Sequence, residues 1–192
     1  MEDFINFFII CVLIYIIYIY FKSNQYEVIY IKSKINNKKY LVRRLPDEQQ
    51  AADLLAQITE KLIQLRDYLE IRYPDDKRVH RFIKKFNEDN ISEGTPDSKY
   101  TSYSVNKGEK IIFCIRSRDE DEKLVKLNTM LFVALHEIAH VITISVGHTE
   151  EFWENFRFLL RESIKLGIYK KQNFSEKPVD YCGMKITDSP LK

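Results

Sequence analysis

This chain of 192 residues has few cysteines and a net charge close to zero. It has three cysteines, an odd number, and Cys11 lies in an apolar N-terminal stretch, so the sequence offers no paired-cysteine framework. We therefore expect a domain suited to a reducing compartment. The formal net charge is only +2, from 30 basic and 28 acidic residues, which gives no overall signal for a polyanionic partner.

Several sequence patterns are also missing. The chain shows no internal repeat, low-complexity tract, glycine-rich phosphate loop or Ser-His-Asp arrangement, and it has only five glycines. Hydrophobic residues make up 45% of the sequence, which is enough to bury a sizeable core. The length and composition predict one globular domain with an appendage.

The appendage is an apolar run over residues 4–21, FINFFIICVLIYIIYIYF, in which Asn6 is the only strongly polar residue. As a helix it would extend about 27 Å, close to the thickness of the hydrocarbon core of a bilayer. The residues before it are acidic and no small-residue cleavage site follows, which argues against a signal peptide. We expect residues 1–22 to be a transmembrane anchor that contacts the lipid bilayer through residues 4–21.

The charges on either side of this run differ in sign. Glu2 and Asp3 precede it, whereas Lys22 and a series of basic residues up to Arg44 follow it. The positive-inside rule then predicts a single-pass membrane protein with its N-terminus outside and its C-terminal domain in the cytosol. The same basic residues could contact anionic lipid headgroups or nucleic acid, although a solvated strand surface is the simpler interpretation.

Residues 23–192 predict an α+β domain, from alternating strand and helix patterns. The expected strands are 26–31, 40–42, 100–105 and 110–116, the last two forming a hairpin around a turn at 106–109. The expected helices are 47–73, 78–86, a buried helix from 131 to just after 145, and one from 150 to about 167 with Thr149 as N-cap. His80 falls on the basic helix 78–86, where we expect a surface position.

Three of the four histidines lie within residues 131–153, LFVALHEIAHVITISVGHTEEFW. On a helix, His136 and His140 lie one turn apart on the same face, so their imidazoles can share one tetrahedral metal ion. Glu137 points slightly aside, where it can hold a water molecule without ligating the metal. The surrounding residues are apolar on almost every face, so these polar side chains suggest a functional site.

A third ligand is expected just beyond the helix. Gly147 can take the left-handed conformation that reverses the chain, which would bring His148 back over the open side of the metal. Glu150, Glu151 or Glu154 could serve in its place, as glutamate does in other HExxH enzymes.

The residue types of the candidate ligands favour a catalytic zinc site over a structural one. Structural zinc is usually closed by four protein ligands, often cysteines, and only Cys114 and Cys182 lie outside the apolar N-terminus. Cys182 could still lie near the zinc. Tyr181 could line the cleft or donate a hydrogen bond to a developing oxyanion, and Trp153 is expected in the core.

The motif HEIAH followed by GHTEEFW resembles the WLM-type and SprT-like zinc metallopeptidases. The segments TSYSVNKGEKIIFCIRSRD, EFWENFRFLLRESIKLGIY and YCGMKITDSP are similar to uncharacterised WLM-like proteins of large nucleocytoplasmic DNA viruses. The resemblance implies a zincin-like domain over residues 23–192, with helices packed on a small, mostly antiparallel sheet. It also implies Zn²⁺ bound by His136, His140 and His148, with Glu137 as general base.

The function predicted from this resemblance is a membrane-anchored zinc endopeptidase, in a host-cell or virion membrane if the protein is viral. A strand before the active helix would form the cleft edge and pair with an extended protein or peptide substrate. Relatives of this type are associated with degrading DNA-crosslinked proteins, but the chain has no clear nucleic-acid-binding motif, so membrane-proximal substrates are equally open. The alternatives are a catalytically silent zinc-fold scaffold and a DNA-tethering protein. The oligomeric state is not indicated.

Overall fold

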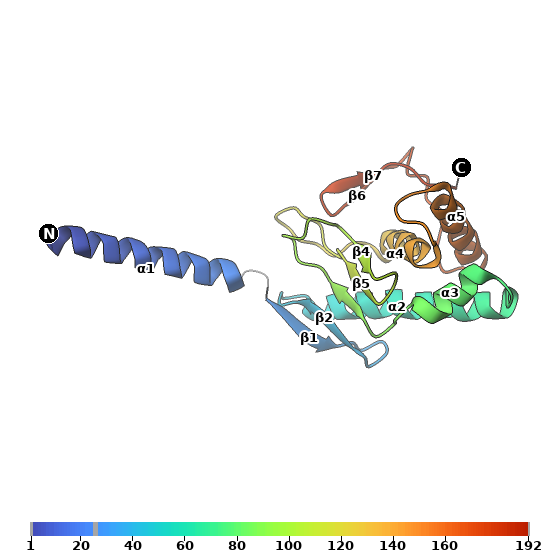
Figure 1. Ribbon diagram of the computed structural model, residues 1–192, viewed down its shortest axis with the longest axis horizontal. Helices are drawn as coiled ribbons and strands as arrows, with labels where there is room; N and C mark the ends of the chain where they lie inside the picture. Colours follow the sequence, from blue (N-terminus) through green and yellow to red (C-terminus); the bar gives the residue numbers. More distant parts are fainter. Residues whose placement is uncertain (1, 25–26, 192) are drawn as a thin grey trace.

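The computed structural model describes residues 2–24 and 27–191 (Figure 1). This part of the chain forms an α+β fold, as expected. The helices are α1 Glu2–Asn24, α2 Glu48–Arg72, α3 Lys77–Lys85, α4 Leu127–Ile142 and α5 Glu150–Lys165. The strands are β1 Val28–Lys32, β2 Lys39–Arg43, β3 Ile91–Glu93, β4 Tyr103–Val105, β5 Lys110–Phe113, β6 Val179–Tyr181 and β7 Met184–Ile186.

The central sheet is mixed, not mostly antiparallel as expected. Its five strands run in the order β1-β2-β3-β5-β4. The outer pairs β1/β2 and β4/β5 are antiparallel, whereas β2/β3 and β3/β5 are parallel. The parallel pairing of β2 with β3 follows from the long connection through α2 and α3, because a crossover of that length returns the chain in the same direction.

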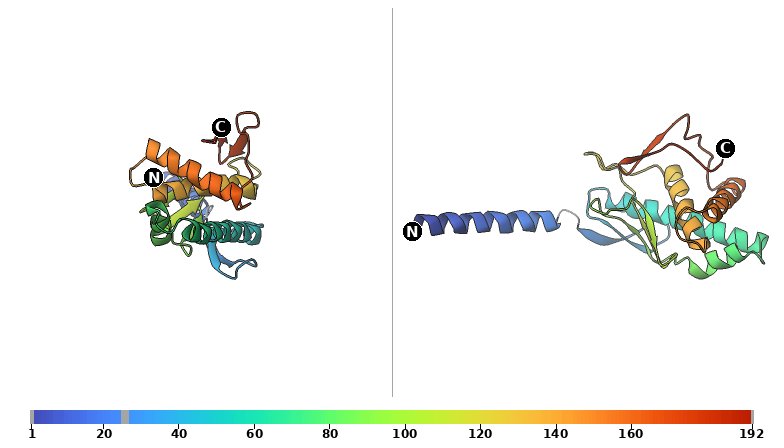
Figure 2. Two further views of the ribbon diagram at one scale, coloured as in Figure 1. Left: turned by 90° about the vertical axis from the view of Figure 1, so that its right-hand side faces the viewer. Right: turned by 45° about the horizontal axis from the view of Figure 1, so that its top comes forward.

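Helix α4 is the most deeply buried helix near the centre of the fold. It packs against α2, α3 and α5 and also contacts β4 (Figures 1 and 2). Between residues 129 and 142, every side chain is buried except those of His136 and His140. The one open strip on α4 therefore coincides with the two histidines of the motif.

Helix α1 extends away from the other elements in Figure 1 and in the right-hand view of Figure 2. A membrane span requires about 20 predominantly apolar residues in one helix. Within residues 2–24 and 27–191, no helix combines the length and the apolar character needed to cross a membrane. The predicted transmembrane anchor at residues 4–21 is therefore wrong, and with it the predicted external N-terminus and cytosolic orientation.

The predicted hairpin is present, and its turn is fixed against α4. The backbone takes positive φ angles at Asn106 (47°), Lys107 (59°) and Gly108 (106°). A Cβ atom on Gly108 would lie 2.7 Å from the carbonyl oxygen of Lys85 and 2.9 Å from a methyl carbon of Val141, so only glycine fits there. This close approach places the edge strand β4 alongside α4.

Cys114 and Cys182 form a disulfide, contrary to the expectation of unpaired cysteines. The S–S distance is 2.08 Å and the Cα atoms are 6.3 Å apart. The bond joins the segment after β5 to the β6–β7 hairpin, 68 positions further along the chain. The expectation of a domain suited to a reducing compartment, which was based on unpaired cysteines, loses its basis. Cys182 is bonded to Cys114, so it is not available as a thiol near a metal.

Candidate metal centre

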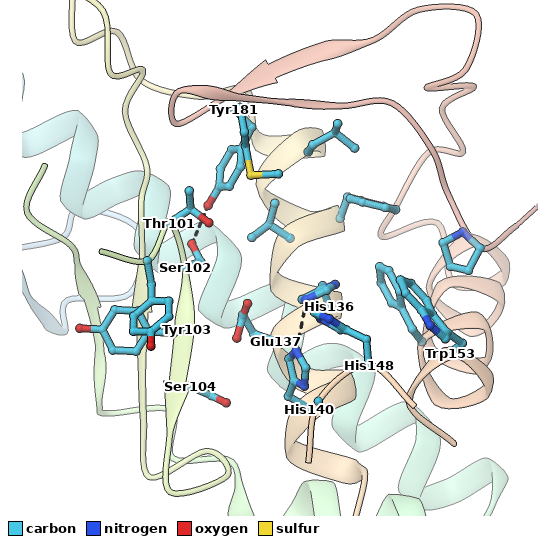
Figure 3. Close-up of a pocket in the computed structure, with 18 of the residues that line it drawn as sticks. Thr101, Ser102, Tyr103, Ser104, His136, Glu137, His140, His148, Trp153 and Tyr181 are labelled. Carbon is cyan, nitrogen blue, oxygen red and sulfur yellow. Dashed lines mark hydrogen bonds between the residues drawn. The ribbon is translucent and has the colours of Figure 1, made fainter. Parts of the chain in front are cut away.

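Three imidazoles converge at the C-terminal part of α4. The Nε2 atom of His136 lies 3.2 Å from Nε2 of His140 and 3.1 Å from Nε2 of His148. The ligand atoms of all three side chains lie within 4.8 Å of one another, and no other such group of metal-binding residues occurs among the described residues. Figure 3 shows the three rings turned toward one another. The sequence spacing predicted this convergence, and the structure brings the three residues together.

The loop that carries His148 begins earlier than expected. Helix α4 ends at Ile142, with Thr143 as C-cap, and not after Ser145. Gly147 has a φ of 85°, as predicted for the chain reversal. The next helix begins as predicted, since the Thr149 side chain accepts a hydrogen bond from the backbone N–H of Phe152.

Glu151 holds this loop from the first turn of α5. Its carboxylate accepts hydrogen bonds from the backbone N–H groups of Ile144 (3.0 Å) and Ser145 (3.1 Å) and from the Ser145 hydroxyl (2.7 Å). These bonds lower the pKa of Glu151 to about 2. Glu151 is thus engaged with the loop backbone and is not in the histidine cluster.

The other candidate ligands also lie outside the cluster. Glu150 forms an ion pair with Arg157 (2.5 Å). Glu154 is exposed and borders a separate cavity next to Arg78. His80 is exposed on α3, where its Nε2 contacts the carbonyl oxygen of Pro74.

Two basic side chains that the sequence analysis missed bind the carbonyl groups at the end of α4. Arg81, on α3, donates to the Ile142 carbonyl (2.8 Å). Lys107, in the β4–β5 turn, donates to the carbonyls of Thr143 (2.9 Å) and Ser145 (2.8 Å). Cations are favourable at a helix C-terminus. No sequence signal links these residues to α4, because both contacts depend on the tertiary fold.

Burial keeps two of the imidazoles neutral. The pKa of His136 falls to about 3, mainly through desolvation and also through the neighbouring His140 and His148. The pKa of His140 falls to about 4, again mainly through desolvation. A metal ligand must be a neutral imidazole. At neutral pH both rings are therefore in the state that binds a metal.

Glu137 is buried beside the cluster, with 5% of its surface exposed. Desolvation raises its pKa to about 8, and a backbone hydrogen bond from Ser104 opposes that rise. In Figure 3 the Glu137 carboxylate lies on the β4 side of the histidines and not among their ring nitrogens. It therefore sits beside the shared centre without belonging to the ligand group.

The histidines and Glu137 open into a cavity of about 1120 Å³. Its walls come from the 100–107 segment, from α4 and α5, and from residues 184–190 near the C-terminus. Tyr181 lines it too, as expected, and its buried hydroxyl lies 2.5 Å from that of Ser102. Trp153 is half-buried and lines the cavity, so the prediction of a core position holds for only part of its ring.

The donor set fits zinc. Four ligands at Zn–N distances of 2.0–2.1 Å in a tetrahedron place neighbouring nitrogens about 3.3 Å apart. The two closest Nε2 separations here, 3.1 and 3.2 Å, are near that value. Three imidazoles facing an open cavity leave one position free, which is the arrangement of catalytic zinc sites and not of closed structural sites.

Comparisons with known proteins identify relatives of this chain in large DNA viruses. An uncharacterised protein of Acanthamoeba polyphaga mimivirus is 36% identical over 192 aligned residues, which cover 98% of this chain and 97% of that protein. An uncharacterised protein of Invertebrate iridescent virus 6 is 30% identical over 145 residues, covering 72% of this chain and 79% of its own length.

Two solved structures of Wss1 from Saccharomyces cerevisiae, one of them a mutant, also align with this chain. Their TM-scores are 0.47 and 0.49, at 19% and 20% sequence identity. The alignments cover 64% and 67% of this chain and 84% and 91% of the two structures. The family model for the WLM domain matches residues 79–190, which include the three histidines and the β6–β7 hairpin. The chain belongs to the WLM domain family.

Proposed function

We propose that this protein is a zinc-dependent endopeptidase. The observation that carries the proposal is the triad of converging imidazoles beside a buried carboxylate, all facing one open cavity. His136, His140 and His148 would hold the ion. Zinc, when bound, acts as a Lewis acid on a carbonyl group and lowers the pKa of a water molecule in its open position.

Glu137 would act as the general base. Its carboxyl group lies next to the histidines and is removed from bulk water, and burial raises its pKa to about 8 in the metal-free chain. The positive charge of a bound zinc ion would lower that pKa, so that the carboxyl group would be ionised and able to act as a base at neutral pH. It would accept a proton from the attacking water and deliver it to the nitrogen of the leaving amine. The low exposure of Glu137 limits the exchange of that proton with solvent.

Strand β4 would align the substrate. It is an edge strand of the five-stranded sheet, in which it pairs with β5. Its residues Tyr103 and Ser104 line the cavity. An extended peptide can add to such an edge through backbone hydrogen bonds. The peptide would then lie across the open face of the histidine cluster.

Tyr181 is the candidate donor for the carbonyl oxygen that becomes negative during attack. Its hydroxyl is buried in the cavity wall and shares a hydrogen bond with Ser102, and burial raises the pKa of Tyr181, so the hydroxyl keeps its proton at neutral pH. A hydrogen bond of this kind contributes about 100-fold or more to the rate in acyl-transfer enzymes. On this proposal, Tyr181→Phe lowers kcat more than it changes KM.

The test is Glu137→Gln with zinc content measured in parallel. We expect the variant to bind zinc as the natural chain does and to lose cleavage of an unfolded protein substrate. Glu70→Gln is the matched control, because Glu70 is exposed on α2. Unchanged turnover in Glu137→Gln would contradict the proposal. Zinc binding without hydrolysis by the natural chain would instead support a catalytically silent zinc-fold scaffold.

A further inference from the structure

The two long walls of the cavity have different chemistry. The wall on the β4 side carries hydroxyl groups, from Thr101, Ser102 and Ser104. The opposite wall is apolar, and side chains from three separate segments meet there: α4, α5 and the C-terminal segment. These side chains are Val133, Trp153, Phe156, Ile186 and Pro190.

The apolar wall begins directly at the histidine cluster. The Trp153 ring stacks on the His148 ring, with centroids 5.6 Å apart and planes at 29°. Its other contacts are with Phe152 at 5.1 Å and Phe156 at 6.4 Å, behind it in the core. Figure 3 shows Trp153 on the opposite side of the histidines from Tyr103 and Ser104. A group bound against Trp153 would therefore adjoin whatever occupies the shared centre.

The C-terminal part of this wall is held in place from two sides. The Cys114–Cys182 disulfide anchors the turn of the β6–β7 hairpin, and the Tyr181 hydroxyl bonds to Ser102. Ile186, at the end of β7, therefore lines the cavity from a hairpin that is held in place by these two contacts. A preformed wall loses little freedom when it binds a ligand.

Charged side chains near this wall already have partners. Arg157 is paired with Glu150 at 2.5 Å, and Lys185 lies 3.8 Å from Asp180. Thr187, Asp188 and Ser189 of the C-terminal segment also line the cavity, and the Asp188 carboxylate accepts a hydrogen bond from the backbone N–H of Ser189 (2.7 Å). Apart from the indole N–H of Trp153, the five apolar side chains of the wall offer no donor or acceptor, and burying a polar group without a hydrogen bond is unfavourable. The chemistry of the wall thus selects an apolar occupant.

We propose that this wall is a specificity subsite that binds a large apolar side chain, such as Leu, Met or Phe, of the substrate residue flanking the scissile bond on the α5 side. The inference rests on the proposed peptidase function and adds the substrate class. A peptide paired with β4 points alternate side chains to either face, and one that crosses the histidine cluster directs a side chain toward Trp153. Val133 and Phe156 form the base of the subsite, and Ile186 and Pro190 cover it.

The chain provides its own probe, because Trp153 is the only tryptophan in the sequence. The experiment titrates the full zinc-loaded chain carrying Glu137→Gln with two peptides that differ only in one residue, Leu or Asp, next to the scissile bond. The peptide pairs cover both flanking positions. We expect the Leu peptide to shift the tryptophan emission and the Asp peptide to bind at least tenfold more weakly.

The kinetic arm uses the natural chain with the same peptides. We expect kcat/KM to favour Leu over Asp by about tenfold or more, in line with the discrimination of hydrophobic pockets. Ile186→Asp should reduce that ratio at least fivefold. Ile71→Asp is the matched control, because Ile71 is 85% exposed on α2, and it should leave the ratio unchanged. Ile186→Ala provides a milder second variant if the aspartate prevents folding.

The outcomes separate the two proposals. Equal cleavage of the Leu and Asp peptides, with no change in tryptophan emission, would overturn the subsite and leave the peptidase function intact. Cleavage of neither peptide by the zinc-loaded natural chain, nor of any unfolded protein, would overturn the peptidase function and this inference with it. A preference for Leu that survives Ile186→Asp unchanged would show that the wall described here is not its source.

Discussion

The α4–α5 region carries the three histidines through contacts close in sequence, whereas the β6–β7 hairpin covers the cavity through a bond to a residue 68 positions away. In the first region, a helical turn, Gly147 and the Glu151 carboxylate bring His148 back to His136 within 12 residues. In the second, Tyr181 and Ile186 reach the cavity because Cys182 is joined to Cys114. The return of His148 to His136 therefore depends mainly on contacts close in sequence, with Arg81 and Lys107 added from other elements. The cavity wall depends on the distant Cys114–Cys182 bond, so the two regions can be disturbed separately.

The largest effect should come from removing a ligand. We expect His140→Ala to weaken zinc binding at least a hundredfold and to abolish peptidase activity, because two remaining imidazoles cannot hold the ion at a catalytic site. Zinc measured by mass spectrometry after dialysis gives the result. His80→Ala is the control, since His80 is exposed on α3 away from the cluster. Full zinc occupancy in His140→Ala would contradict the account of the site.

Breaking the disulfide should leave zinc binding intact but destabilise the β6–β7 hairpin that covers the cavity. We expect Cys114→Ser and Cys182→Ser each to lower the free energy of unfolding by about 4 kcal/mol, the value for a closed loop of this length. Zinc should still bind, because the histidines do not depend on the hairpin. Denaturant unfolding measures the change, and Cys11→Ser, at an exposed free cysteine, is the control. A natural chain whose Cys114 and Cys182 are fully alkylated without reductant would contradict the disulfide.

Glu137 should make the stability of the metal-free chain depend on pH. Its folded pKa of about 8 lies above the ordinary 4.5, so the folded state keeps a proton that the unfolded state releases. Its contribution is fully present below pH 4.5 and is lost as the pH rises through 8, by an amount on the order of 5 kcal/mol. Glu137→Gln should remove that dependence. Unfolding of metal-free protein between pH 5 and 9 measures it, and parallel curves for the two proteins would contradict the buried carboxylate.

Loss of the loop contact from Glu151 should have the smallest effect. Glu151→Gln weakens the hydrogen bonds to Ile144 and Ser145, so His148 is less well positioned and zinc affinity should fall about tenfold at pH 7, as for other supporting groups. The low pKa of about 2 means that this contact is complete above pH 4.5 and is lost as the pH falls through 2. Competition with a zinc chelator measures the affinity. Glu150→Gln, one residue away, should have little effect, and equal losses in both variants would contradict the role of Glu151.

Local sequence patterns predicted much of the histidine cluster. The spacing of His136 and His140 on an apolar helix, the reversal at Gly147 and the Thr149 N-cap all depend on interactions within one or two helical turns, and the structure has each of them. The β4–β5 hairpin was also predicted, because its turn residues lie between two apolar strands.

The features that the sequence did not predict all depend on distant residues. The parallel pairing of β2 with β3 depends on how α2 and α3 pack. The Cys114–Cys182 bond joins segments that meet only in the folded chain, and cysteine spacing alone does not define pairing. Arg81 and Lys107 reach the end of α4 from two other elements. The anchor at residues 4–21 was predicted from the length of an apolar run and the charges on either side of it, and no helix within the described ranges meets the requirements of a membrane span. The expectations about partners, nucleic acid and the lipid bilayer among them, stay predictions.

The measurement that tests the central claim most directly is zinc-edge X-ray absorption of the purified full chain. The account predicts one zinc per chain, bound by three imidazole nitrogens and one oxygen, with His136, His140 and His148 each required for that signal. A chain that binds no stoichiometric zinc, or zinc with a sulfur ligand or a fourth imidazole, would contradict it.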